Sequence, residues 1–173
     1  MMGSAMIGGE YCRVMARYNA WQNSQLFGFL GAMPPEELTR DRGAFFGSIL
    51  GTVNHILWGD CMWMSRFDGG AAPRVSGVEG PGMHADLTGW QGERVDMDAR
   101  ISDWVSGLKD QDLAQHLTWY SGVLGRETGN QLGLCVVGFF NHQTHHRGQV
   151  HAMLTAAGSK APVSDLFLLP EAG

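Results

Sequence analysis

Lysine is scarce in this chain of 173 residues, which contains only Lys109 and Lys160. Arginine supplies the other basic side chains, and the formal net charge is -5 with the histidines taken as neutral. Nucleic-acid-binding surfaces concentrate Lys and Arg against phosphates, and membrane-surface anchors gather them in short basic segments. No window of this sequence does either. We therefore expect neither nucleic acid nor a membrane as a partner.

The sequence also lacks paired cysteines and long apolar runs. No apolar stretch approaches the roughly 20 residues that cross a bilayer. The first ten residues, MMGSAMIGGE, have neither the charged start nor the apolar stretch of a signal peptide, so we expect a cytoplasmic protein. The cysteines Cys12, Cys61 and Cys135 are odd in number and form no CxxC motif. Their apolar surroundings predict three buried free thiols.

Helical periodicity is the strongest pattern that the sequence does contain. With 44% hydrophobic residues, the chain can enclose one core, and we expect a single domain over residues 1–173. Apolar residues recur at three- and four-residue intervals in four long segments, Glu10–Leu30, Asp41–Phe67, Thr88–Leu108 and Gln131–Ala157. The second segment is apolar nearly all round, and Gly158 follows the fourth in a capping position. The pattern predicts an all-α four-helix bundle with the second helix at its centre.

The connections between these helices differ in character. Pro34 and Pro35 end the first helix, and the EEL that follows predicts a short connecting helix. Residues 68–86 are dense in Gly and Pro, which predicts a long loop over one end of the bundle. The segment LTWYSGVLGRETGN predicts an extended or hairpin excursion before the fourth helix. The apolar tail SDLFLLP is expected to lie across the bundle or against a neighbouring subunit.

Histidine is concentrated in the fourth helix, where four of the seven fall within ten residues. His142 and His146 are four residues apart and share a helix face, so both rings can meet one ion, as in zinc proteases. His145 projects about 60° from His142 and about 100° from His146 on the helical wheel. His151 points to the side opposite His142. These two are therefore the poorer ligands.

A third metal ligand must come from another helix. His55 interrupts the apolar segment GTVNHILWGD, where an unpaired ring would be costly. Because bundles build metal sites between facing helices, we predict that His55, His142 and His146 hold a divalent ion, zinc or nickel. Three neutral imidazoles leave an open position, as in catalytic zinc sites. The alternative is a bundle whose histidines make ordinary hydrogen bonds and bind no ion.

Five further polar side chains are candidates for the surroundings of this ion or for substrate binding. Gln149 lies about 20° from His142 on the helical wheel, and its amide could bond a ligand or a substrate. Asp60, one turn beyond His55, could orient a ring. Arg147 could bind an anionic substrate group or pair with a surface carboxylate. Asn141 and His145 complete the set.

The segments YNAWQN, NHILWGDCMW and NHQTHHRGQVHAML resemble those of the DinB-like family of bacterial four-helix-bundle metalloproteins. The resemblance runs from about Tyr18 to the end of the fourth helix and is most specific in HQTHHRGQ. It implies a metal triad of His55, His142 and His146, and a homodimer. The wider superfamily contains S-transferases and isomerases that use low-molecular-weight thiols such as bacillithiol, mycothiol or glutathione. The resemblance therefore implies a metal-dependent thiol S-transferase acting on a small electrophile.

Two other functions fit the same residues. In a metal-dependent hydrolase the ion would activate water, but the glutamate that serves zincins as general base is replaced by Gln143, which cannot take a proton. A hydrolase would need its base elsewhere. In a non-catalytic metal- or small-molecule-binding stress protein, a fourth protein ligand such as His145 would close the coordination sphere.

Overall fold

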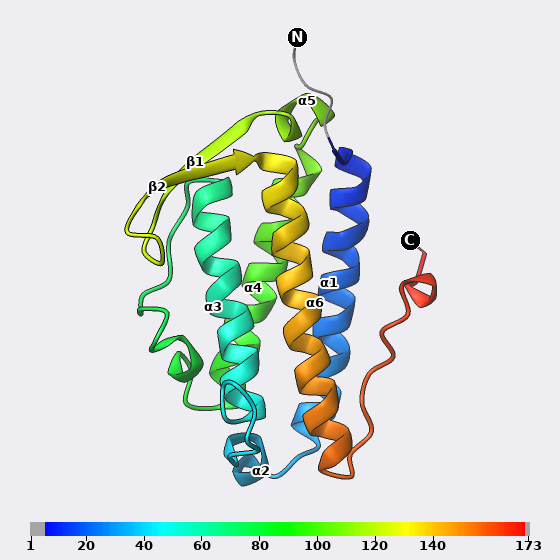
Figure 1. The fold of residues 1–173 in the computed structure, drawn as a ribbon. Coiled ribbons are helices and arrows are strands. Elements are labelled where there is room, and N and C mark those ends of the chain that lie inside the picture. The colour runs from blue at the N-terminus through cyan, green and yellow to red at the C-terminus, as the bar shows by residue number, and fades with distance from the viewer. Residues whose placement is uncertain (1–5, 172–173) are drawn as a thin grey trace.

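The computed structural model describes residues 6–171, in which four long helices form a bundle (Figure 1). These helices are α1 (Gly9–Gly31), α3 (Ile49–Phe67), α4 (Leu87–Ser106) and α6 (Leu132–Ala156). The expected all-α bundle is thus confirmed. The shorter elements are α2 (Pro35–Thr39), the 3-10 turns η1 (Gly80–Gly82) and η2 (Leu166–Leu168), α5 (Asp110–Leu113), and the strands β1 (His116–Ser121) and β2 (Arg126–Gln131).

The long helices pack in a cycle in which α1 contacts α4 and α6, and α3 contacts α4 and α6. In Figure 1, α1 and α6 run in one direction and α3 and α4 in the other. The pair α3 and α6 is therefore antiparallel and adjacent. Histidines on these two helices can face each other across one interface.

Residues 68–86 run along the outer side of α3, not over one end of the bundle as the sequence suggested (Figure 1). Because α3 and α4 are parallel, the chain must return the length of the bundle between them. Two side chains of α3 fasten the loop to the helix. Asn54 Nδ2 donates to the carbonyls of Pro81 and His84 at 3.0 and 2.8 Å, and Trp58 Nε1 donates to the carbonyl of Val75 at 2.9 Å.

The helix α3 begins at Ile49, eight residues later than the periodicity of the sequence predicted. Gly43 and Gly47 have φ angles of 66° and 72°, a left-handed conformation that a helix cannot continue. Ser48 then caps the helix by accepting a hydrogen bond from the Gly51 amide at 3.0 Å. The preceding turn leaves Phe45 exposed and places Phe46 against the histidines.

The helix α4 begins at Leu87, one residue before the predicted start, and Asp86 caps it, since the Asp86 carboxylate accepts from the Gly89 amide at 2.9 Å. The buried residues of α4 include Arg94 and Met97. Val95, which follows Arg94, is exposed. At the other end of the fold, Gly158 follows α6 with a φ of 77°, as its capping position predicted.

The hairpin of β1 and β2 confirms the expected excursion before α6. The C-terminal tail lies along α1 (Figure 1), where Tyr18 and Gln22 donate to the carbonyls of Ser164 and Val163 at 2.6 and 2.8 Å. All three cysteines are buried and free. Across residues 6–171, no helix combines the length and apolarity needed to span a bilayer.

Candidate metal centre

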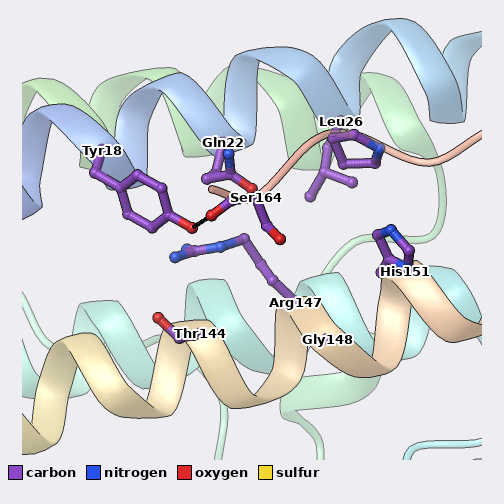
Figure 2. A pocket seen from close by; sticks show the side chains of 9 residues that line it. Tyr18, Gln22, Leu26, Thr144, Arg147, Gly148, His151 and Ser164 are labelled. Carbon is purple, nitrogen blue, oxygen red and sulfur yellow. Dashed lines mark hydrogen bonds between the residues drawn. The ribbon is translucent and has the colours of Figure 1, made fainter. Parts of the chain in front are cut away.

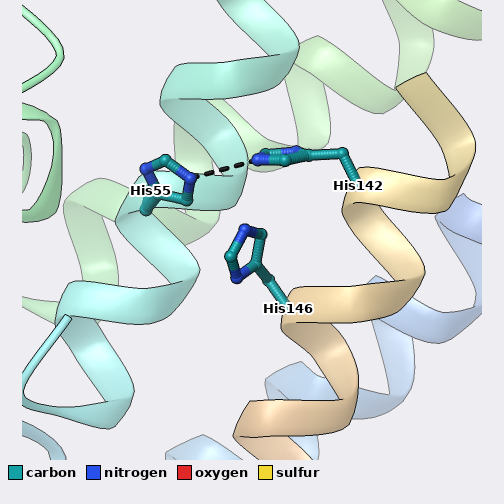
Figure 3. Close-up of side chains that lie close together, drawn as sticks. All are labelled: His55, His142 and His146. Atoms are coloured by element: carbon teal, nitrogen blue, oxygen red, sulfur yellow. Dashed lines mark hydrogen bonds between the residues drawn. The ribbon is translucent and has the colours of Figure 1, made fainter. Parts of the chain in front are cut away.

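Three histidine rings converge between α3 and α6 (Figure 3). His55, His142 and His146 each offer one ring nitrogen, and these three atoms all lie within 4.8 Å of one another. The Nε2 atoms of His55 and His142 are 3.1 Å apart. The structure thus brings together the residues that spacing and resemblance selected.

A glycine makes room for one of these rings. Gly59 lies one turn after His55 on α3, and a Cβ at this position would be 2.7 Å from Cε1 of His142. Real Cβ atoms do not approach other carbons so closely. The His142 ring can therefore pack against the α3 backbone only because residue 59 has no side chain.

Aromatic side chains enclose the His55 ring. Phe46 stacks on it with centroids 3.8 Å apart and planes 23° apart, and Trp58 lies nearly parallel to it at 6.2 Å. Phe46 also contacts His146 edge-on at 5.3 Å. The His55 ring is thus held by Phe46, from the turn before α3, and by Trp58, whose indole also fastens residues 68–86. The periodicity of the sequence had assigned Phe46 to a helix and gave no sign of this contact.

The histidine rings are held in the neutral form. Burial, reinforced by the neighbouring histidines, lowers the pKa of His55 and of His142 to about 4. Burial also lowers the pKa of His146. A neutral imidazole keeps a lone pair available for a cation, so all three rings are ready ligands at neutral pH.

The donor set fits a divalent metal ion. Nδ1 of His146 donates to Oε1 of Gln149 at 2.8 Å, which leaves Nε2 of this ring free to act as a ligand. Nδ1 of His55 and Nδ1 of His142 are buried without a hydrogen-bond partner among the described residues. Tetrahedral ligands about 2.0–2.1 Å from zinc lie about 3.3 Å apart, close to the separation of the two Nε2 atoms. The group includes no carboxylate, so an ion here would keep its full charge.

The remaining candidates around the centre take different positions. Gln149 hydrogen-bonds one of the candidate metal ligands, as expected, and that ligand is His146. His145 is exposed, packs its ring on His146 at 4.7 Å, and lies outside the ligand group. Asn141 is also exposed, and its side chain makes no hydrogen bond to another side chain within residues 6–171. Neither residue closes the coordination sphere.

Asp60 does not orient a histidine ring, because it follows His55 by five residues and points about 140° away around the helix. Its carboxylate accepts from Arg94 Nη1 at 2.5 Å and from Gln143 Nε2 at 2.9 Å. Arg94 in turn donates to Asp98 at 2.8 Å. Burial raises the pKa of Asp60, against the opposing charge of Arg94. Asp60 therefore belongs to a buried polar network and not to the metal centre.

Arg147 extends this network to the first helix. It follows His146 by one residue, about 100° around α6, and points toward α1, where Nη1 donates to Asn19 Oδ1. Asn19 in turn donates to Asp98. Burial lowers the pKa of Arg147 to about 10. The network thus ties together all four long helices. Within residues 6–171 Arg147 bonds Asn19 and forms no ion pair with a surface carboxylate, which was one of its two expected roles.

These features define the chain as a helical-bundle protein with a three-histidine group suited to a divalent ion. The family model described as the DinB family matches residues 2–172, so the chain belongs to the DinB family. It is 27% identical over 164 residues to Protein DinB of Bacillus subtilis (strain 168). The aligned residues cover 92% of this chain and 93% of that protein.

A solved structure supports the fold independently. A DinB-like protein from Bacillus cereus ATCC 10987 superposes with a TM-score of 0.59 over 83% of this chain and 90% of that chain. The two sequences are 17% identical, so this likeness shows the fold alone. It confirms the DinB-like helical bundle.

Proposed function

We propose that His55, His142 and His146 bind one divalent metal ion and that the protein is a metal-dependent thiol S-transferase. The observation that carries this proposal is the convergence of three neutral ring nitrogens within 4.8 Å, with no carboxylate in the group. Three protein ligands leave a position for an exogenous ligand. When bound, the ion supplies a Lewis-acidic position that lowers the pKa of a thiol bound to it.

The protein's own thiols are poor nucleophiles, which supports an external thiol. Burial raises the pKa of Cys12 to about 11 and that of Cys61 to about 12. Burial also raises the pKa of Cys135. Because the thiolate is the reactive form, none of the three is prepared to attack a substrate at neutral pH.

The residues around the centre hold the histidine rings in the orientation that binds the ion. Gln149 holds the His146 ring in the tautomer with a free Nε2, and Phe46 stacks on the His55 ring and holds it in place. The incoming thiol loses its proton to solvent, and its sulfur attacks an electrophilic carbon of the substrate. With an alkyl halide, the new S–C bond forms as the halide departs with the electron pair of the broken bond. With an epoxide or an α,β-unsaturated carbonyl compound, the electron pair of the opened C–O or C=C π bond stays on the product, which takes a proton from solvent.

The buried polar network offers a hydrolase no free carboxylate base. Asp60 is the carboxylate on α3, and both of its oxygens are occupied by Arg94 and Gln143. A hydrolase would therefore rely on the ion to deprotonate its attacking water, so the two reactions are separated by whether turnover requires a thiol.

The test uses protein purified without an affinity tag and loaded with zinc or nickel. Glutathione, bacillithiol and mycothiol are each offered with alkyl halides, epoxides and α,β-unsaturated carbonyl compounds, beside a His146→Ala control. We expect thiol-dependent turnover that the control lacks. Turnover equal to the control for every pair would refute the transferase. Thiol-independent turnover of esters or lactones would establish the hydrolase instead.

Metal binding itself is tested by elemental analysis of His55→Ala and His142→Ala. We expect both variants to lose the ion. Stoichiometric metal in both would refute the triad, whatever the outcome of the activity assays.

A further inference from the structure

A cavity of about 280 Å³ lies between α1, α6 and the C-terminal tail (Figure 2). None of the residues that line it belongs to the metal centre. Its polar lining residues include Gln22, Thr144, Arg147 and Ser164. The tail forms one of its walls, and the hydrogen bond from Tyr18 to the Ser164 carbonyl fastens this wall to α1.

Arg147 brings a buried positive charge to this cavity. Its residue exposure is 8%, and in Figure 2 its guanidinium extends from α6 toward Tyr18 and Ser164. Nη1 donates to Asn19. Nε and Nη2 donate to no protein atom within residues 6–171, yet they are not among the fully enclosed polar atoms. They are therefore open to the cavity as unused donors.

No carboxylate of the described residues forms a direct ion pair with Arg147. Asp60 is occupied by Arg94 and Gln143, and Asp98 by Arg94 and two asparagines of α1. A buried guanidinium whose direct partner is a neutral amide still has donors for an anion. Its planar fork matches a carboxylate in a bidentate arrangement.

The other walls restrict the rest of the ligand. The Tyr18 ring lies 5.7 Å from the Arg147 guanidinium carbon, and Leu26 and Pro162 add apolar surface. The Thr144 hydroxyl donates to the Phe140 carbonyl at 3.0 Å, so Arg147 supplies the donors for an anion. Ligand pockets usually have volumes of about 300–1,000 Å³, so this cavity suits a small molecule of about amino-acid size or less. Among the described lining residues, His151 is the other basic side chain and Arg147 is the one that is buried. A single buried guanidinium together with apolar walls fits an organic monoanion better than a multiply charged phosphate.

We propose that this cavity binds a small organic monocarboxylate whose carboxylate bonds Nε and Nη2 of Arg147. The site is separate from the three histidines, and the proposal does not depend on the metal chemistry. The ligand packs its apolar part against Tyr18 and Leu26. The C-terminal tail closes over it.

The experiment follows the ¹H–¹⁵N spectrum of the zinc-loaded protein, including the Arg147 Nε–H resonance, during titration at constant ionic strength. The probes are propionate, benzoate and inorganic phosphate. We expect propionate or benzoate to shift this resonance saturably, together with amides of α1, α6 and the tail. Absence of saturable shifts with both carboxylates, or saturation by phosphate alone, would overturn the proposal.

A variant that fills the cavity without touching Arg147 locates the site. A Cβ at Gly148 would meet no atom within 4 Å, and Gly148 lines the cavity, so Gly148→Leu introduces its side chain from an open position on the cavity wall. We expect this variant to lose carboxylate affinity by about tenfold or more, with its zinc content unchanged. The matched control is Gly92→Leu, at an equally open helix position on α4 outside the cavity. Undiminished binding in Gly148→Leu, or equal loss in both variants, would overturn the proposed location.

Discussion

Gly59 and His142 face each other across the α3–α6 interface so closely that a single methyl group at residue 59 would overlap the imidazole ring. The required Cβ would lie 2.7 Å from Cε1 of His142. We expect Gly59→Ala to displace this ring and to weaken zinc binding by about 10- to 100-fold, the usual effect of disturbing the support of a metal ligand. Competition against a fluorescent zinc chelator measures the change.

The control for this substitution is Gly138→Ala, on α6, where a Cβ would meet no atom within 4 Å. Both changes raise helix propensity by a similar amount, so a difference between them reports the contact with His142. Equal zinc affinity in the two variants would show that the contact does not matter for the ion.

The hydrogen bond from His146 to Gln149 gives a second prediction. Gln149→Leu removes the acceptor of Nδ1, so the ring loses its fixed tautomer, and zinc affinity should fall by about 10- to 100-fold. Gln149→Glu keeps an acceptor at this position and should retain most of the affinity. Titration calorimetry measures the zinc affinity of each variant and of the unchanged protein. His145→Ala, which leaves the His146–Gln149 bond intact, should bind zinc as the unchanged protein does.

The network around Asp60 predicts a large effect on stability. Asp60→Asn leaves Arg94 with a buried charge that is only partly compensated, and the free energy of unfolding should fall by about 3 kcal/mol. Urea denaturation measures the loss. Asp68→Asn breaks the more exposed pair with Arg100 and should cost less than about 1 kcal/mol. A comparable loss in both variants would contradict the role given to burial.

The lowered histidine pKa values predict how the metal-free protein responds to acid. Unfolded histidine takes up a proton near its usual pKa of 6.5, whereas His55 and His142 in the fold do so only near pH 4. Between these values the unfolded chain binds more protons, so the free energy of unfolding falls as the pH decreases from about 6.5 to 4. Above about pH 6.5 these histidines are neutral in both the folded and the unfolded chain, so they no longer change the free energy of unfolding with pH.

Thermal unfolding in the presence of a chelator, recorded across this pH range, measures the effect. His142→Phe should show a smaller decrease, because one of the two neutral rings is gone. An identical pH profile in this variant would contradict the assignment of the effect to the buried rings.

The four helices and the three histidines could be predicted because each depends on a repeating or local pattern. Periodic apolar residues mark long helices wherever a single face is buried. The spacing of His142 and His146 fixes their common face without knowledge of the fold. Pairing them with His55 required only that two helices face each other, together with the resemblance to a family.

The remaining features depend on contacts between segments far apart in the chain. The start of α3 was placed too early because Phe45 and Phe46 continue the apolar pattern, although the left-handed Gly43 and Gly47 interrupt the helix. Asp60 and Arg147 were placed beside the ion because they are close to ligands in sequence. Their side chains point instead to partners on other helices, which no local pattern reveals.

The parallel course of α3 and α4 also bears on the order in which the protein folds. With residues 68–86 spanning the length of the bundle, α1 must find α4 and α3 must find α6 across long stretches of chain. His55 and His142 are 87 positions apart. Contacts of such separation form slowly, since the closing of a long loop precedes any gain from packing. An ion that needs both helices can bind only an assembled chain, so added zinc should slow unfolding and leave the refolding rate nearly unchanged.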